Sequence, residues 1–361
     1  MKKQVKITNH VARKAAPQVQ RRIDALKIGQ KMQDLPEELW HESFRRYVKE
    51  TPNRGGGPNL RMIRLNPNEP SLTVTGFIFN KFVHPYENRF ITVREAARLQ
   101  GFPDELEFMG PLTSAQRQVG NAVPVPLAEA LFREILSIAD RMKSRKKTLT
   151  ALSLFCGAGG LDIGAERAAS ELGRRIDVRV ATDLWRDACK TLANYRGDKT
   201  SVVESDITKI EDPLEFWRTN AKIKTPPDVV FGGPPCQSFS QAGKQKGLND
   251  KRGLLVYDFI RFVEKLSPTF FLMENVSNIK SANKGAFCRE IVETFESLGY
   301  DVASGALCAV DYGAPQKRKR MLFLGVKKEF GAPSLPLPTR GVGLKPCATV
   351  GEAFRGLPVL P

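Results

Sequence analysis

The residue best suited to nucleophilic chemistry, Cys236, lies in a short turn that follows an apolar segment. The segment Asp228–Phe231 leads into Gly232-Gly233-Pro234-Pro235 and then Cys236, so a buried strand would deliver the thiol into a turn that glycine and proline make rigid. A structural cysteine usually packs within an apolar face. This cysteine is instead flanked by proline and polar residues, where a thiolate can react. The pattern predicts a nucleophile at Cys236.

A carboxylic acid, Glu274, follows a second apolar segment, Phe270-Phe271-Leu272-Met273. In the simplest structural interpretation, Glu274 caps the next helix. In the functional interpretation it is a partly buried carboxyl that can donate a proton, because burial disfavours its charged form.

A glycine-rich turn, Leu154–Gly160, predicts close approach of the backbone to a bound cofactor. Alone it is equally typical of any tight strand-to-helix turn or of a dinucleotide-binding fold. Asp183 ends another candidate strand, where an acid can accept hydrogen bonds from ribose hydroxyls. Asp206 ends a further short segment and is a candidate partner for an adenine amino group. Isolated acids such as these more often cap helices or lie in solvated loops.

The elements that would position these residues form an α/β pattern. Near-continuous apolar strands separated by helices favour a parallel, doubly wound, Rossmann-like sheet covered on both faces, and ligands bind such sheets beyond the carboxyl ends of the strands. The candidate strands are Leu149–Phe155, Val178–Thr182, Asp228–Phe231, Phe270–Glu274 and Met321–Val326.

The first part of the chain has a different texture. It is basic and weakly periodic up to about residue 66, with helical candidates near 17–27 and 36–49, followed by extended sequence over 71–83. Thr92 and Glu95 have the spacing of a capping box and predict a helix start at Thr92. A second helix follows Pro126, since apolar residues recur there on one helical face. A charged linker, Arg141–Lys147, comes next.

Composition limits the partners and the compartment. The net charge of +17 and the pI near 9.7 favour a polyanionic partner, because neutralising phosphates releases counterions. No run of about 18 apolar residues is present, and the start of the chain is polar, so we expect neither a membrane span nor secretion. The six scattered cysteines show no CxxC spacing and the three histidines lie far apart. We therefore expect reduced thiols, no metal site and a cytoplasmic location.

Taken together, the motifs resemble those of the DNA cytosine-5 methyltransferase family. The resemblance covers the chain from about residue 60 to 338. The similar segments are Phe155–Gly160 (cofactor loop), Pro234–Gln237 (nucleophile motif), Glu274–Val276 (base-holding motif), Gln316–Arg320 (QxRxR motif), Arg94–Pro103 (late structural helix) and Gln118–Pro124 (last motif).

The resemblance implies S-adenosylmethionine as the methyl donor and a flipped-out cytosine in duplex DNA as the target. It implies catalytic roles for Cys236, Glu274, Arg318 and Arg320. The implied cofactor contacts are Phe155, Cys156, Gly157, Gly159, Gly160, Asp183, Leu184, Asp206, Ile207, Gly233, Pro235, Leu255, Asn121 and Ala122. The implied DNA contacts are Gln237, Ser240, Lys244, Lys246, Arg252 and Asn275, several of them in a mobile active-site loop over 240–253.

The motif order departs from the family pattern, because segments that close the chain in most relatives here precede the cofactor loop. A circular permutation would explain this order. We expect a small target-recognition domain over 1–110, a catalytic domain over 111–338 with helix 126–142 packed on it, and a tail over 339–361 that returns toward the small domain. We also expect a monomeric, nucleoid-associated prokaryotic protein of a restriction-modification system or an orphan enzyme.

Three other functions fit parts of the pattern. An RNA (tRNA) cytosine-5 methyltransferase could use the same scaffold. A non-catalytic DNA-binding protein is disfavoured by the intact Cys236, Glu274, Arg318 and Arg320. A nicotinamide-dependent oxidoreductase would account for the glycine-rich turn alone, leaving the Pro-Pro-Cys turn and the basic charge unexplained.

Overall fold

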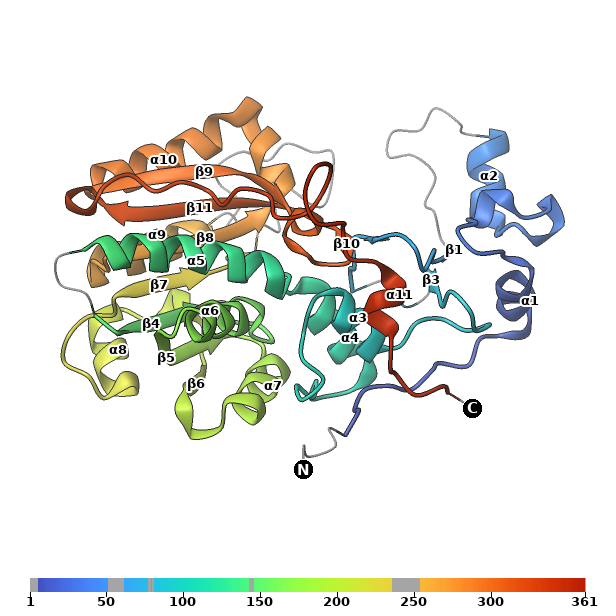
Figure 1. Cartoon of the computed structure of the whole chain (residues 1–361), viewed down its shortest axis with the longest axis horizontal. Helices are drawn as coiled ribbons and strands as arrows, with labels where there is room; N and C mark the ends of the chain where they lie inside the picture. The colour runs from blue at the N-terminus through green and yellow to red at the C-terminus, as the bar shows by residue number, and fades with distance from the viewer. Residues whose placement is uncertain are drawn as a thin grey trace.

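The computed structural model describes residues 6–50, 62–76, 79, 81–142, 146–235 and 254–360, without the side chains of 254 and 281–284. Its main feature is a seven-stranded sheet in the order β6-β5-β4-β7-β8-β11-β9 (Figure 1). The strands are β4 (Thr148–Leu154), β5 (Arg175–Asp183), β6 (Ser201–Glu204), β7 (Val229–Gly232), β8 (Phe270–Val276), β9 (Tyr300–Cys308) and β11 (Lys319–Lys327).

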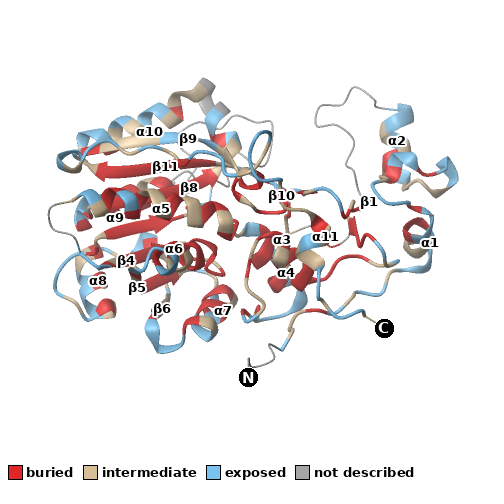
Figure 2. Cartoon of the chain, viewed as in Figure 1, coloured by how far each residue is buried: buried red, intermediate tan, exposed pale blue. Residues whose placement is uncertain are grey.

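Helices cover both faces of this sheet, as the alternation of apolar strands and helices predicts. Side chains alternate in direction along a strand, so Leu149 and Ala151 of β4 pack on one face and Leu152 and Leu154 on the other. The first face carries α5 (Val125–Arg141) and α6 (Gly160–Glu171). The second carries α8 (Pro213–Ala221), α9 (Leu254–Leu266) and α10 (Ala286–Ser297), and α7 (Arg186–Arg196) follows β5. The central strands are consequently buried along most of their length (Figure 2).

The sheet departs from the expectation in two ways. The predicted strand Met321–Val326 lies within β11, but β11 runs antiparallel to both β8 and β9 rather than parallel. Its central residues are fully buried, and burial on both faces produces the continuous apolar run that is typical of parallel strands. In addition, β6 and β9 were not among the predicted strands. Both lie at the edges of the sheet, where many of their side chains are only partly buried.

A smaller unit is built from sequence that precedes the sheet. The helices α3 (Val93–Leu99) and α4 (Leu112–Asn121) share a core with the short α11 (Val350–Phe354) near the C-terminus. The predicted capping box is confirmed: Thr92 Oγ1 accepts from Glu95 N at 3.2 Å, and Glu95 Oε2 accepts from Thr92 N at 2.7 Å. Residues on both sides of the predicted domain boundary at 110 belong to this one core. The division of the chain into a recognition domain and a catalytic domain at this residue stays a prediction.

The N-terminal region adds α1 (Pro17–Ala25) and α2 (Glu42–Glu50), close to the predicted helices. They pack with the two-residue strands β1 (Ile63–Arg64) and β3 (Phe82–Val83) around a separate small core, at the far right of Figure 1. The predicted extended stretch 71–83 contains only β2 (Ser71–Leu72) and β3 as strands among its described residues, and residues 77, 78 and 80 lie outside the described part. Among the described residues, no helix combines the length and apolar character needed to cross a bilayer.

Part of the C-terminal tail is hydrogen-bonded to residues 67–69, which precede the sheet in sequence. Val350 N donates to Glu69 O at 2.9 Å, and Gly351 N donates to Pro67 O at 2.8 Å. Near the other end of the chain, His10 Nε2 lies 2.9 Å from Pro358 O. Segments from the beginning and the end of the sequence therefore meet on the small unit.

Candidate active site

The glycine-rich turn joins β4 to α6 at the carboxyl edge of the sheet. Phe155, Gly157 and Gly159 have φ values of 51°, 52° and 84°, a left-handed conformation that costs a non-glycine residue about 1–2 kcal/mol. A Cβ on Gly160 would lie 2.2 Å from Val123 O. The turn is therefore packed directly against the segment that follows α4. Next to this segment, Asn121, the last residue of α4, is exposed, and Ala122 is half-buried.

Asp183 connects the end of β5 to this turn. Its Oδ2 accepts from Gly157 N at 2.9 Å and its Oδ1 accepts from Trp185 N at 2.8 Å. Burial raises the pKa of the Asp183 carboxyl, while the backbone N–H groups oppose the shift. The neighbouring Leu184 is 67% exposed, and a Cβ on Gly157 would meet nothing within 4 Å. The carboxylate and an exposed apolar side chain thus adjoin open space above the turn.

The other predicted cofactor residues occupy the same edge with differing exposure. Asp206 follows β6, and its Oδ1 accepts from Thr208 N at 3.1 Å and Thr208 Oγ1 at 2.7 Å. This is the capping geometry of the simpler structural interpretation. Ile207 is buried, and Leu255 is half-buried at the start of α9.

Glu274 lies at the carboxyl edge, almost fully buried within the end of β8. Arg320 Nε on the neighbouring β11 approaches its Oε1 at 2.6 Å. Burial raises the pKa of Glu274, and the charges of Arg320 and Arg318 only partly offset the shift. The site therefore favours the protonated acid more than water does.

The turn that leads to Cys236 is held against this carboxyl. A Cβ on Gly233 would lie 2.8 Å from Glu274 Oε2, so a larger residue at this position would require the carboxyl to shift. Asn275 Nδ2 donates to Pro234 O at 3.1 Å. Asn275 is buried, so its side chain acts within the protein, and its predicted contact with DNA stays a prediction. Cys236 lies outside the described residues, as do the predicted DNA contacts Gln237, Ser240, Lys244, Lys246 and Arg252. Pro235, the last described residue before the cysteine, is exposed.

Some residues of the 316–320 motif contact the small unit, and one contacts Glu274. Arg318 is 1% exposed and donates to Val74 O and, at 2.9 Å, to Gly120 O. Burial lowers its pKa well below the usual range. Gln316, on β10 (Gln316–Lys317), donates to Gln100 Oε1 at 2.6 Å. Gln316 and Arg318 thus join the sheet to the small unit, and Arg320 carries the contact with Glu274.

Arg318 was predicted among the catalytic residues; it is buried and hydrogen-bonded to Val74 O and Gly120 O, and its catalytic role stays a prediction. The sequence pattern also did not identify Gln100 and Gln316 as residues that connect the sheet to the small unit. Alternation along an extended strand places residues 316, 318 and 320 on one side. That pattern could not distinguish their partners, which belong to distant segments of the chain.

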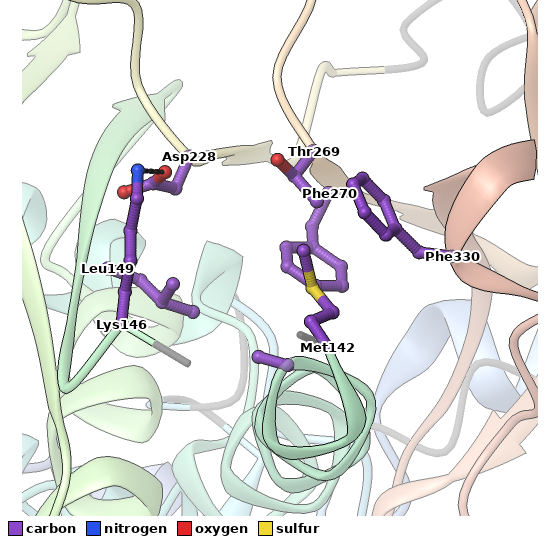
Figure 3. Close-up of a pocket in the computed structure, with 8 residues that line it drawn as sticks. Met142, Lys146, Leu149, Asp228, Thr269, Phe270 and Phe330 are labelled. Carbon is purple, nitrogen blue, oxygen red and sulfur yellow. Dashed lines mark hydrogen bonds and ion pairs between the residues drawn. The ribbon is translucent and has the colours of Figure 1, made fainter. Parts of the chain in front are cut away.

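A separate pocket lies at the opposite edge of the sheet (Figure 3). Its lining residues are Ala139, Met142, Lys146, Leu149, Asp228, Thr269, Phe270 and Phe330. Lys146 Nζ pairs with Asp228 Oδ1 at 2.6 Å, and Asp228 Oδ2 accepts from Thr150 N at 2.8 Å. These contacts hold the end of the linker to the amino ends of β4 and β7, away from Glu274. Within the described parts of the chain, no group of three or more His, Cys, Asp or Glu residues is arranged to hold a metal ion.

A family model described as C-5 cytosine-specific DNA methylase matches residues 2–137 and 149–345. The Type II methyltransferase M.FnuDI of Fusobacterium nucleatum is 36% identical over 187 residues, covering 52% of this chain and 49% of the relative. M.AquIA of Picosynechococcus sp., also a Type II methyltransferase, is 37% identical over 231 residues, covering 57% and 88%.

The chain spans about half the length of most curated relatives that it matches. Among solved structures, it is similar to a protein described as a DNA modification methyltransferase encoded within a prophage (E. coli). The sequence identity is 31%, the TM-score is 0.46, and the match covers 59% of this chain and 56% of the other.

Proposed function

Because the chain belongs to the C-5 cytosine-specific DNA methylase family, we propose that it transfers a methyl group from S-adenosylmethionine to C5 of a cytosine in a specific duplex DNA site. The observation that carries the proposal is the buried Glu274, held by Arg320 and lying directly against the turn that leads to Cys236. The names of the relatives support a modification enzyme of the Type II class.

The carboxyl edge of the sheet fits S-adenosylmethionine. Asp183 would accept hydrogen bonds from ribose hydroxyls with the lone pairs that Gly157 and Trp185 leave free. The exposed Leu184 would pack against the adenine, and the open space above Gly157 admits a ligand close to the backbone. When bound, S-adenosylmethionine supplies an electrophilic methyl group.

The residues around Glu274 would make cytosine reactive. The Cys236 thiolate forms a bond to C6 of the flipped-out base, and the electrons of the C5–C6 double bond become available at C5. A proton or hydrogen bond from Glu274 to N3 lowers the barrier to that attack. Arg320 keeps the Glu274 carboxyl in place. After the methyl transfer, water takes the proton from C5, the C5–C6 double bond re-forms, and the bond between C6 and the sulfur breaks to return the Cys236 thiolate.

The test of this proposal is a covalent adduct. Duplex DNA with 5-fluorocytosine at the target position should trap Cys236, because fluorine at C5 cannot leave as a proton does. We expect a denaturation-resistant complex from the wild type and from the control Cys347→Ala, and none from Cys236→Ala. An adduct with Cys236→Ala would overturn the nucleophile assignment. Methylation of tRNA but not of duplex DNA would favour the RNA enzyme instead.

We also propose that the motif order reflects a circular permutation. In support, α5 precedes β4 in sequence yet packs on α6, which follows β4. A Cβ on Gly164 of α6 would lie 2.4 Å from Ala128 Cβ of α5, so the two helices are in close contact. The contact between His10 and Pro358 brings sequence from near both ends together.

Reversing the permutation should preserve activity. A Gly/Ser tether would join Pro361 to Met1, and the chain would be reopened within residues 143–145. Lys146 would keep its ion pair with Asp228. We expect a folded protein with the same sequence preference and comparable turnover, measured by bisulfite sequencing and a methyl-transfer assay. Inactive or insoluble products at every tether length would indicate that the N-terminal region was appended rather than rotated.

A further inference from the structure

A short loop near the C-terminus, residues 340–345, presents an apolar tip between two basic residues. Val342 is fully exposed and Leu344 is 51% exposed. The two ends of the loop are joined through their backbones: Arg340 and Lys345 form an isolated β-bridge, and Gly341 N donates to Lys345 O at 3.0 Å. Gly343 adopts a φ of 74°, and Leu344 N donates to Gly341 O at 3.1 Å. The backbone therefore holds Val342 outward in a defined geometry.

The base of the loop is hydrogen-bonded to the segment that precedes the 316–320 motif in sequence. Thr339 N and Arg340 N both donate to Asp311 O, at 2.9 and 3.0 Å. Asp311 belongs to the short 3₁₀ helix Ala309–Tyr312, which lies between β9 and β10. In Figure 1 the loop is the red turn beside β10, at the end of the sheet that faces the small unit.

Basic residues lie at both ends of the loop and at the start of β11. Arg340 Nη1 donates to Pro346 O at 3.1 Å, which fixes that guanidinium at the base of the loop. Lys345 is exposed, and so is Lys319, whose register partner on β9 is Cys308, the residue before the 3₁₀ helix. A fully exposed valine is unfavourable in water. Apolar side chains flanked by cations are suited to DNA, where cations contact phosphates and apolar groups contact base edges in a groove.

We propose that the loop 340–345 contacts duplex DNA beside the target cytosine, with Lys345 on a phosphate and Val342 against bases in a groove. This inference rests on the proposed function and adds a DNA-binding element outside the predicted set of contacts. None of the hydrogen bonds that hold the loop involves Glu274 or the glycine-rich turn, so the loop would act on DNA affinity rather than on the chemical step.

The experiment measures duplex binding as a function of salt for Lys345→Gln and Val342→Ser. Loss of one phosphate contact should reduce the slope of log K against log salt by about 1. Loss of the valine contact should weaken binding and raise the KM for DNA by about fivefold, with kcat and cofactor affinity unchanged. The matched controls are Lys265→Gln, an exposed lysine at the opposite edge of the sheet, and Leu337→Ser, which is 83% exposed on the same tail.

Two outcomes would overturn the inference, and they are distinguishable. If the wild type binds and methylates duplex DNA but both variants match their controls in affinity and salt slope, the loop proposal alone is wrong. If the wild type binds no duplex DNA at any salt concentration, the proposed function fails together with the loop. Thermal melting of each variant checks that the fold is intact.

Discussion

Replacing Glu274 by glutamine should lower the rate of methyl transfer by a factor of about 10² to 10⁴, the usual contribution of a general acid. Glutamine keeps the size of the side chain and can donate an N–H, but it cannot transfer a proton to N3 of cytosine. The measurement is single-turnover methylation with saturating DNA and cofactor. Glu293→Gln, an exposed acid on α10, is the control. A rate within about threefold of the wild type would remove Glu274 from the mechanism.

The pH dependence gives an independent readout of the same residue. Burial raises the pKa of Glu274, and the proposed mechanism uses the protonated acid. In a plot of the wild-type rate against pH, the rate should therefore fall as the pH rises through the pKa of Glu274. The profile of Glu274→Gln should lack this descending limb. Persistence of the same falling limb in the variant would assign it to another group.

Replacing Asp183 by alanine should weaken S-adenosylmethionine binding by about 2–4 kcal/mol, because the two charge-assisted hydrogen bonds that we propose between Asp183 and the ribose would be lost. This corresponds to a factor of about 30 to 1,000 in Kd. Calorimetric titration measures the effect, and Asp198→Ala, an exposed acid after α7, is the control.

The alanine variant also removes the acceptor for Gly157 N and Trp185 N, so part of the effect could come from relaxation of the turn. Asp183→Asn separates the two causes, since its amide oxygen can still accept from one backbone N–H. We expect intermediate affinity for this variant. Unchanged affinity in a folded Asp183→Ala protein would exclude the residue from the cofactor site.

The amino-acid sequence by itself determined those features that depend on local signals. Apolar runs identified the central strands β4, β5, β7 and β8, and glycine and proline identified the turns that follow β4 and β7. The same edge of a parallel sheet collects the ends of its strands, so the sequence pattern was sufficient to assign Asp183 and Glu274 to one edge. The cap at Thr92 was equally local, because its hydrogen bonds span three residues.

Only the tertiary structure decided which partners distant segments choose. The direction of β11 depends on its hydrogen bonds to β8 and β9, and an apolar run has the same pattern in either direction. Arg318 and Arg320 have the same residue type and nearly the same position, yet one binds the carbonyls of Val74 and Gly120 and the other binds Glu274. Residues up to 244 positions apart in sequence meet in these contacts. Local propensity carries no information about such pairings, because they arise only when separate segments pack against one another.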